Sequence, residues 1–99
     1  MIYEIAQIEV KDGHQAEFEA GAAKAVALFH RAKGCHSMRV DHSVEKPTHY
    51  TLTVEWETIE DHMVHFRESA DFQEWRALVG PHFASPPQVE HMNTVLKGF

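Results

Sequence analysis

Cysteine is nearly absent from this chain of 99 residues, which contains only Cys35. A single thiol cannot form an internal disulfide, and a lack of disulfides is typical of proteins from reducing compartments. No stretch approaches the roughly 18 consecutive apolar residues of a membrane-spanning helix. The first ten residues also lack the basic start and long apolar run of a signal peptide. We therefore expect a cytoplasmic protein.

Lysine and arginine are outnumbered, with nine of them against 15 aspartate and glutamate residues. The net charge is -6 at pH 7 when histidine is neutral. Nucleic acids and anionic membranes are bound by clusters of Lys and Arg, and the sequence holds no such cluster. We therefore expect no nucleic acid and no membrane among its partners. The unusual feature of the composition is its nine histidines.

The sequence also lacks internal repeats, low-complexity tracts and long linkers. Its length predicts a single domain over residues 1–99. Hydrophobic residues make up 43% and charged residues 24% of the chain, as in ordinary soluble domains. A domain of this size buries only about 65% of the surface of its unfolded chain, so a partner subunit would enlarge its core.

Four segments have the composition of β-strands. In the clearest one, apolar Tyr50, Leu52, Val54 and Trp56 alternate with polar residues, which is the period of a strand with one buried face. The first segment has apolar residues on both faces, with Ile5 opposite Ile2, Ala6, Ile8 and Val10, as expected of a strand covered on both sides. The predicted strands are residues 2–10, 35–44, 48–57 and 88–96.

Two segments have helical periodicity. In residues 14–33, Phe18, Ala22, Val26 and Phe29 recur every three or four positions, and Gly34 provides a stop.

A second helix is predicted over residues 59–79, with Thr58 as its N-cap and Asp61 as a weak capping-box partner. "ESAD" interrupts it, so that a second helical piece begins near Ser69, and Gly80-Pro81 ends it. The residues expected on its buried side are Ile59, Met63, Phe66, Phe72, Trp75, Leu78 and Val79.

The order of these elements is βαββαβ. It predicts an α+β, ferredoxin-like fold, in which an antiparallel sheet carries both helices on one face. No chain remains to cover the other face. A second copy related by twofold symmetry is the simplest cover, so we expect a homodimer.

Particular residues follow the same order as in a known family. Trp56 ends a strand, His65 follows nine residues later, "RESADFQEW" comes next, and "PP" precedes a last strand that carries His91. This chain resembles the antibiotic biosynthesis monooxygenase family, of the dimeric α+β barrel superfamily. The resemblance implies a homodimer with a cavity in each subunit between sheet and helices. It also implies oxidation of a small aromatic, quinol-type or polyketide-like substrate by O2 without a cofactor.

The chain departs from the pattern of this family at two places. Many members carry a Glu two residues before the tryptophan, where this sequence has Val54. The haem-degrading branch has a Trp and a haem-ligating His in the order opposite to His65 and Trp75. The interchanged order argues against haem chemistry. Because a fold alone does not determine function, two alternatives to the oxygenase stay open, a non-catalytic barrel that binds a small apolar ligand and a haem-handling protein.

The family reaction predicts a set of site residues. The protein must deprotonate its substrate, and His65 or His62 is the candidate base because an imidazole pKa lies near working pH. Trp56 would stack on the flat substrate. Arg67, or else Arg39, would stabilise the anion. The other expected substrate-binding residues are Phe66, Phe72, Trp75, His91 and Asn93.

His62 and His65 could also ligate one metal ion, because residues three apart are neighbours on a helix. A third ligand would have to come from His91, His82 or Glu55. The sequence has no HExxH motif, cysteine pair or acidic cluster with ligand spacing, so we expect no metal site.

Overall fold

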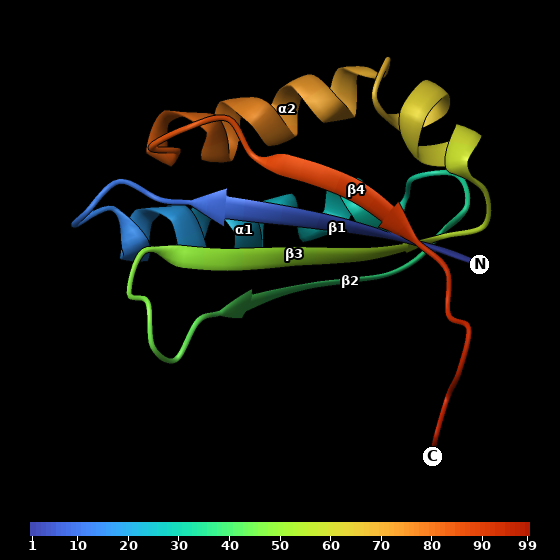
Figure 1. The fold of residues 1–99 in the computed structure, drawn as a ribbon. Coiled ribbons are helices and arrows are strands. Elements are labelled where there is room, and N and C mark those ends of the chain that lie inside the picture. Colours follow the sequence, from blue (N-terminus) through green and yellow to red (C-terminus); the bar gives the residue numbers. More distant parts are fainter.

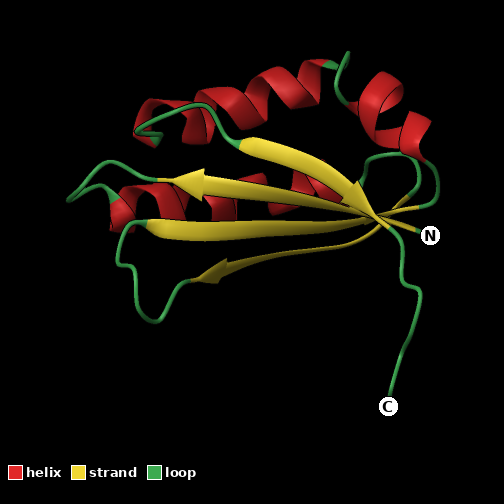
Figure 2. Ribbon diagram, in the orientation of Figure 1, coloured by secondary structure: helices red, strands yellow, loops and turns green.

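The computed structural model describes residues 1–99 and has the predicted βαββαβ order, with short helical turns added on either side of the second helix (Figure 1). The strands form one antiparallel sheet in the order β2-β3-β1-β4. Figure 2 shows both helices on the same side of the sheet. The elements are β1 (Ile2–Glu9), α1 (Gln15–His30), β2 (Cys35–His42), β3 (His49–Trp56), a π-helical turn (Asp61–Phe66), α2 (Ala70–Val79), a 3-10 turn (Gly80–His82) and β4 (Gln88–Met92).

The core lies between the sheet and the helices, and the two central strands supply its floor. On β3 the predicted alternation is confirmed, because Tyr50, Leu52, Val54 and Trp56 are all buried. On β1 the residues with even numbers face the helices, and Ala6 is buried among them. The core face of β1 and β3 is therefore continuous.

Helix α1 packs closely on both the sheet and α2. Phe18, Ala25 and Phe29 are fully buried on its inner side. Val26, which the periodicity places on that side, is 49% exposed, and Ala25 faces the core instead. A Cβ at Gly21 would stand 2.5 Å from the carbonyl oxygen of Leu78 in α2, so only glycine permits this close crossing.

The second helical region differs from prediction. The chain first makes a π-helical turn at Asp61–Phe66, in which the amide of Arg67 donates to the carbonyl of His62 at 2.9 Å. This i to i+5 bond widens the turn, so His62 and Phe66 face the core and Ile59 is 46% exposed. The Thr58 hydroxyl accepts from the Asp61 amide at 3.2 Å, as expected for a cap.

Helix α2 begins after Ser69, whose hydroxyl accepts from the amide of Phe72 at 3.2 Å. Trp75 and Val79 are buried on its inner side. No helix in the protein combines the length and apolar character that a membrane crossing requires.

The last strand is shorter than the predicted 88–96 and ends at Met92. The reason is its neighbour, because Met92 pairs with Tyr3, at the very start of β1. Residues 93–99 therefore have no strand to pair with, and they leave the sheet as a tail (Figure 1).

Candidate active site

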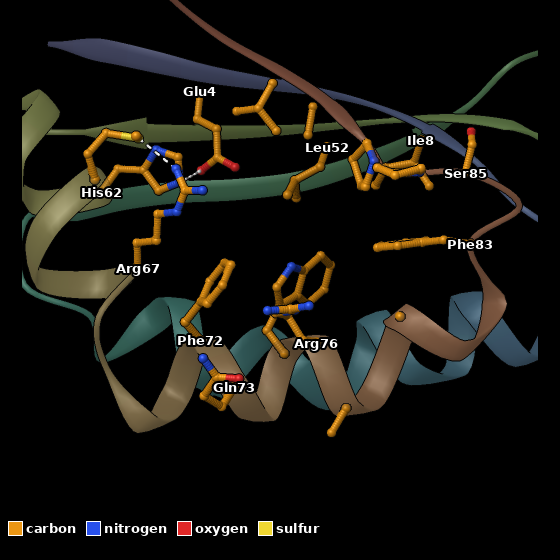
Figure 3. A pocket seen from close by; sticks show the side chains of 18 of the residues that line it. Glu4, Ile8, Leu52, His62, Arg67, Phe72, Gln73, Arg76, Phe83 and Ser85 are labelled. Carbon is orange, nitrogen blue, oxygen red and sulfur yellow. Dashed lines mark hydrogen bonds and ion pairs between the residues drawn. The ribbon is translucent and has the colours of Figure 1, made fainter.

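A cavity of about 1240 Å³ lies between the sheet, α2 and the segment that leads into β4. Figure 3 shows Glu4, His62 and Arg67 gathered at one end of it, with Phe83 at the other. The rest of the wall is mainly apolar and includes Ile8, Leu52, Phe72, Trp75 and Val89.

Glu4 is the charged residue that the fold buries most deeply in this wall, at 6% exposure. It faces the helices because it shares a side of β1 with Ala6 and Ile8. The indole Nε1 of Trp56 donates to Glu4 Oε1 at 3.0 Å. Burial raises the pKa of Glu4 to about 7, although the hydrogen bond from Trp56 acts to lower it.

His62 stands next to this carboxyl group. Its Nε2 lies 3.3 Å from Glu4 Oε1, and its ring stacks on Trp56 with centroids 5.4 Å apart and an interplanar angle of 16°. Burial lowers the pKa of His62 to about 4, and the neighbouring His91 and Arg67 lower it further. The imidazole is therefore neutral at pH 7.

His91 completes a chain of three groups. It pairs with Glu4 in the register of β1 and β4, and its Nε2 is 2.8 Å from His62 Nδ1. Both nitrogens of His62 are thus engaged, one toward His91 and one toward Glu4. When Glu4 is ionised, Nε2–H of His62 faces the carboxylate and Nδ1 accepts from His91 Nε2–H. His91 Nδ1 is then left as the free acceptor of the Glu4–His62–His91 chain.

The profile of the antibiotic biosynthesis monooxygenase family matches residues 1–78. The chain belongs to this family. A Bordetella bronchiseptica structure whose name places it among these monooxygenases is 59% identical over 96% of this chain and 97% of its own, with a TM-score of 0.94. The uncharacterised protein YczJ of Bacillus subtilis is 37% identical over 96% of this chain and all of its own. A Nitrosomonas europaea structure at 22% identity shares the fold, with a TM-score of 0.83 over 97% of this chain and 100% of its own.

Glu4 supplies a carboxyl group near the position of Val54, where many family members carry a Glu. The two residues are direct partners in the register of β1 and β3. The carboxyl group beside Trp56 therefore comes from the neighbouring strand in this chain. The sequence contained a signal for it, since Glu4 is the charged residue on the otherwise apolar face of residues 2–10. Our sequence interpretation did not use that signal.

The structure brings some of the predicted site residues to the cavity. His62, His91, Arg67, Phe72 and Trp75 all line it. Arg67 has no acidic partner, and its Nη1 lies 3.9 Å from the sulfur of Met63.

Other predicted residues lie elsewhere. His65 is exposed, because the wide π-helical turn directs His62 and Phe66 inward and His65 outward. Trp56 is fully buried behind Glu4 and His62, and its indole contacts those side chains rather than the cavity. Phe66 packs in the core, with its ring centroid 4.9 Å from that of Phe29.

Two more of these residues belong to the uncovered face of the sheet. Asn93 lies beyond the end of β4 and lines a groove on that face. Arg39 also lines this groove and pairs with Asp41 at 3.0 Å. Neither side chain lines the cavity.

The suggested metal ligands do not assemble around His62 and His65. Glu55 points away from the core face of β3. His82 lies beyond the far end of β1, with its Nδ1 3.1 Å from Nδ1 of His14. His62 contacts His91 through Nδ1 and faces Glu4 through Nε2. These three groups therefore do not converge on a single point.

Proposed function

We propose that this protein is a monooxygenase that oxidises a small aromatic, quinol-type or polyketide-like substrate with O2, without a cofactor. The observation that carries the proposal is the Glu4–His62–His91 chain in the wall of a largely apolar cavity. Such a wall suits a flat organic molecule, and the polar chain suits removal of its proton.

The electrons for this reaction come from the substrate. A CH2 group flanked by aromatic rings is converted to a carbonyl while O2 gives one oxygen atom to the product and one to water. Removal of a proton first gives an electron-rich anion that can reduce O2. The protein's task is therefore to take that proton and to hold the anion in a site with little water.

The proton passes first to Nδ1 of His91. From there, the 2.8 Å contact leads to His62 and the 3.3 Å contact leads to Glu4. With a pKa of about 7 against about 4 for His62, Glu4 is the better final acceptor of the two. His91 is the catalytic base in this scheme, and His62 and Glu4 receive the proton behind it.

Arg67 stabilises the resulting anion. It is a cavity-lining cation without an acidic partner, and Figure 3 shows it at the same end as His62. Phe72, Trp75 and Leu52 provide apolar surface for the rest of the substrate.

The test is oxygen uptake by the purified protein with a panel of hydroquinones and anthrones. We expect uptake with at least one of them, and a rate lowered by roughly 10²–10⁴-fold in His91→Gln. His65→Gln is the matched control, because His65 is exposed outside the cavity, and it should keep the full rate. Equal rates in the two variants would contradict the proposal. Tight binding of these compounds without oxygen uptake would indicate the non-catalytic barrel instead.

We also propose that the active form is a homodimer joined through the uncovered face of the sheet. That face carries a groove lined by Tyr3, Ile5, Met92, Val95 and Leu96, among others. Val95 and Leu96, on the tail, are 92% and 83% exposed. A second copy would cover these apolar side chains, and the contact should bury more than roughly 1,000 Å² in total.

Light scattering at micromolar concentration tests the dimer. We expect the wild type to have twice the mass of one chain and Leu96→Asp to shift toward the monomer. Val44→Asp is the control, because Val44 is equally exposed, at 94%, and lies in the hairpin between β2 and β3. A monomeric wild type would refute the dimer.

A further inference from the structure

A second group of imidazoles lies at the other end of β1, away from the Glu4–His62–His91 chain. His14 Nδ1 and His82 Nδ1 are 3.1 Å apart, and Glu17 Oε2 is 3.9 Å from His82 Nδ1. One ligand atom from each of the three residues lies within 4.8 Å of the others. We name these residues the His14–Glu17–His82 cluster.

The backbone holds this cluster from two sides. His14 and Glu17 are three residues apart at the start of α1, so their side chains lie on one side of the first turn. The turn before α1 contains Gly13 with φ of +84°, a conformation that favours glycine. Lys11 fixes the opposite segment, because its amide donates to the carbonyl of His82 at 2.8 Å and its ammonium to that of Pro81 at 3.0 Å.

We propose that the His14–Glu17–His82 cluster binds one divalent transition-metal ion of the zinc class. Two imidazole nitrogens and a carboxylate oxygen are a ligand set that such ions prefer. Two nitrogens at about 2.0 Å from a tetrahedral ion stand about 3.3 Å apart, close to the observed 3.1 Å. Glu17 has a side chain that is 64% exposed, so it can rotate the short distance to the ion.

The chemistry of the cluster also sets its selectivity. Ca²⁺ and Mg²⁺ prefer oxygen ligands, and this cluster offers only one carboxylate. Three protein ligands leave a fourth position for water. The two close Nδ1 atoms have a simpler explanation, a shared hydrogen bond between imidazoles, and the experiment distinguishes the two.

An ion at this position would tie the Gly80–His82 turn to α1. Phe83 follows directly, lines the cavity and packs on Phe18 of α1 with ring centroids 6.3 Å apart. The ion would therefore fix the apolar end of the cavity. This inference does not depend on the proposed oxygenase reaction.

The experiment is a calorimetric titration of tag-free protein with ZnCl2, repeated with MgCl2. We expect one Zn²⁺ per chain and no comparable binding of Mg²⁺. Loss of a ligand should weaken Zn²⁺ binding by at least about tenfold in His82→Gln and Glu17→Gln. The control is His36→Gln, which removes an imidazole from another His–Glu pair, the exposed one with Glu57, and should bind Zn²⁺ like the wild type.

A second variant and a second measurement keep the test decisive if one variant fails to fold. His14→Gln removes the other imidazole and should lose the same affinity. Zn²⁺ should raise the melting temperature of the wild type and of His36→Gln, but not of His14→Gln or His82→Gln. Wild-type Zn²⁺ affinity in the folded His14→Gln or His82→Gln variant would overturn the proposal, as would an absence of Zn²⁺ binding in the wild type.

Discussion

Near each end of β1 lies a group of three side chains with the same composition, two imidazoles and one glutamate. In the Glu4–His62–His91 chain, the side chains of Glu4 and His62 are each 7% exposed. In the His14–Glu17–His82 cluster, those of Glu17 and His82 are 64% and 17% exposed. Composition alone therefore does not decide what such a group does.

Geometry separates the two ends as much as burial does. His62 stands between its neighbours and uses a different nitrogen for each, so the three groups form a line. At the other end, the Nδ1 atoms of His14 and His82 face each other and a carboxylate oxygen lies nearby, so the three groups converge. A line of groups is suited to passing a proton, and a convergent set is suited to holding an ion.

The largest expected effect is on the rate of oxygen uptake, when an imidazole is removed from one end and, for comparison, from the other. His62→Gln should lower the rate of oxygen uptake by roughly 10²–10⁴-fold, because it interrupts the path between His91 and Glu4. His82→Gln, measured without added metal on the same substrate, should keep a rate close to that of the wild type. Similar losses in both variants would remove the distinction between the two ends.

The next effect is on the pH dependence of the free energy of unfolding, which should differ between variants of Glu4 and Glu17. The pKa of Glu4 is about 7 in the folded protein, above its ordinary 4.5, so the folded state binds this proton more tightly than the unfolded state. The stability that this proton contributes is complete below about pH 4.5 and is lost as the pH rises through about 7. Glu4→Gln does not suffer this loss.

Between about pH 5 and about pH 8, the free energy of unfolding of Glu4→Gln should therefore rise relative to the wild type by on the order of 2 kcal/mol. His62 contributes in the opposite sense. Its pKa is lowered to about 4, so it reduces the stability of the folded state as the pH falls below about 6.5. Comparing the variant with the wild type at each pH removes this contribution, because both proteins contain His62. Glu17→Gln, at an exposed position, should show no such rise. Urea unfolding at the two pH values measures both variants.

A somewhat smaller loss is expected from Trp56→Phe. The change removes the indole donor from a buried carboxyl group but keeps an aromatic ring to stack on His62. The expected cost is about 1–2 kcal/mol in the free energy of unfolding. If Trp56→Phe were as stable as the wild type at neutral pH, the bond to Glu4 would not be holding the buried end in place.

The smallest effect should come from an exposed pair of the same chemical type. His36 contacts Glu57 with side chains that are 42% and 58% exposed. His36→Gln should change the free energy of unfolding by less than about 1 kcal/mol, because water screens such surface pairs. A loss as large as that of Trp56→Phe would show that burial is not what distinguishes the histidines of this protein.

The sequence predicted the sheet and the helix order because their signals are local. The alternation of Tyr50, Leu52, Val54 and Trp56 determines one face of β3, and the turn at Gly34 separates α1 from β2. The end of β4 at Met92 was not predictable in this way, because it depends on where the partner strand β1 begins.

The site was harder to predict than the fold. The sequence left open whether His62 or His65 is the base, and the π-helical turn places His62 inward and His65 outward. Glu4 reaches Trp56 and His62 from 52 and 58 positions away in the sequence, so its role depends on strand pairing. Trp56 was expected to stack on the substrate, but the structure places it behind Glu4 and His62 and outside the cavity lining.

The central claim is that the buried chain takes a proton from the substrate. It is tested most directly by mixing the protein with an anthrone in the absence of oxygen and recording the absorbance of the enolate. Our account predicts that the wild type and His65→Gln produce the enolate band, whereas His91→Gln and His62→Gln do not. An enolate band of wild-type size in His91→Gln and His62→Gln would contradict it.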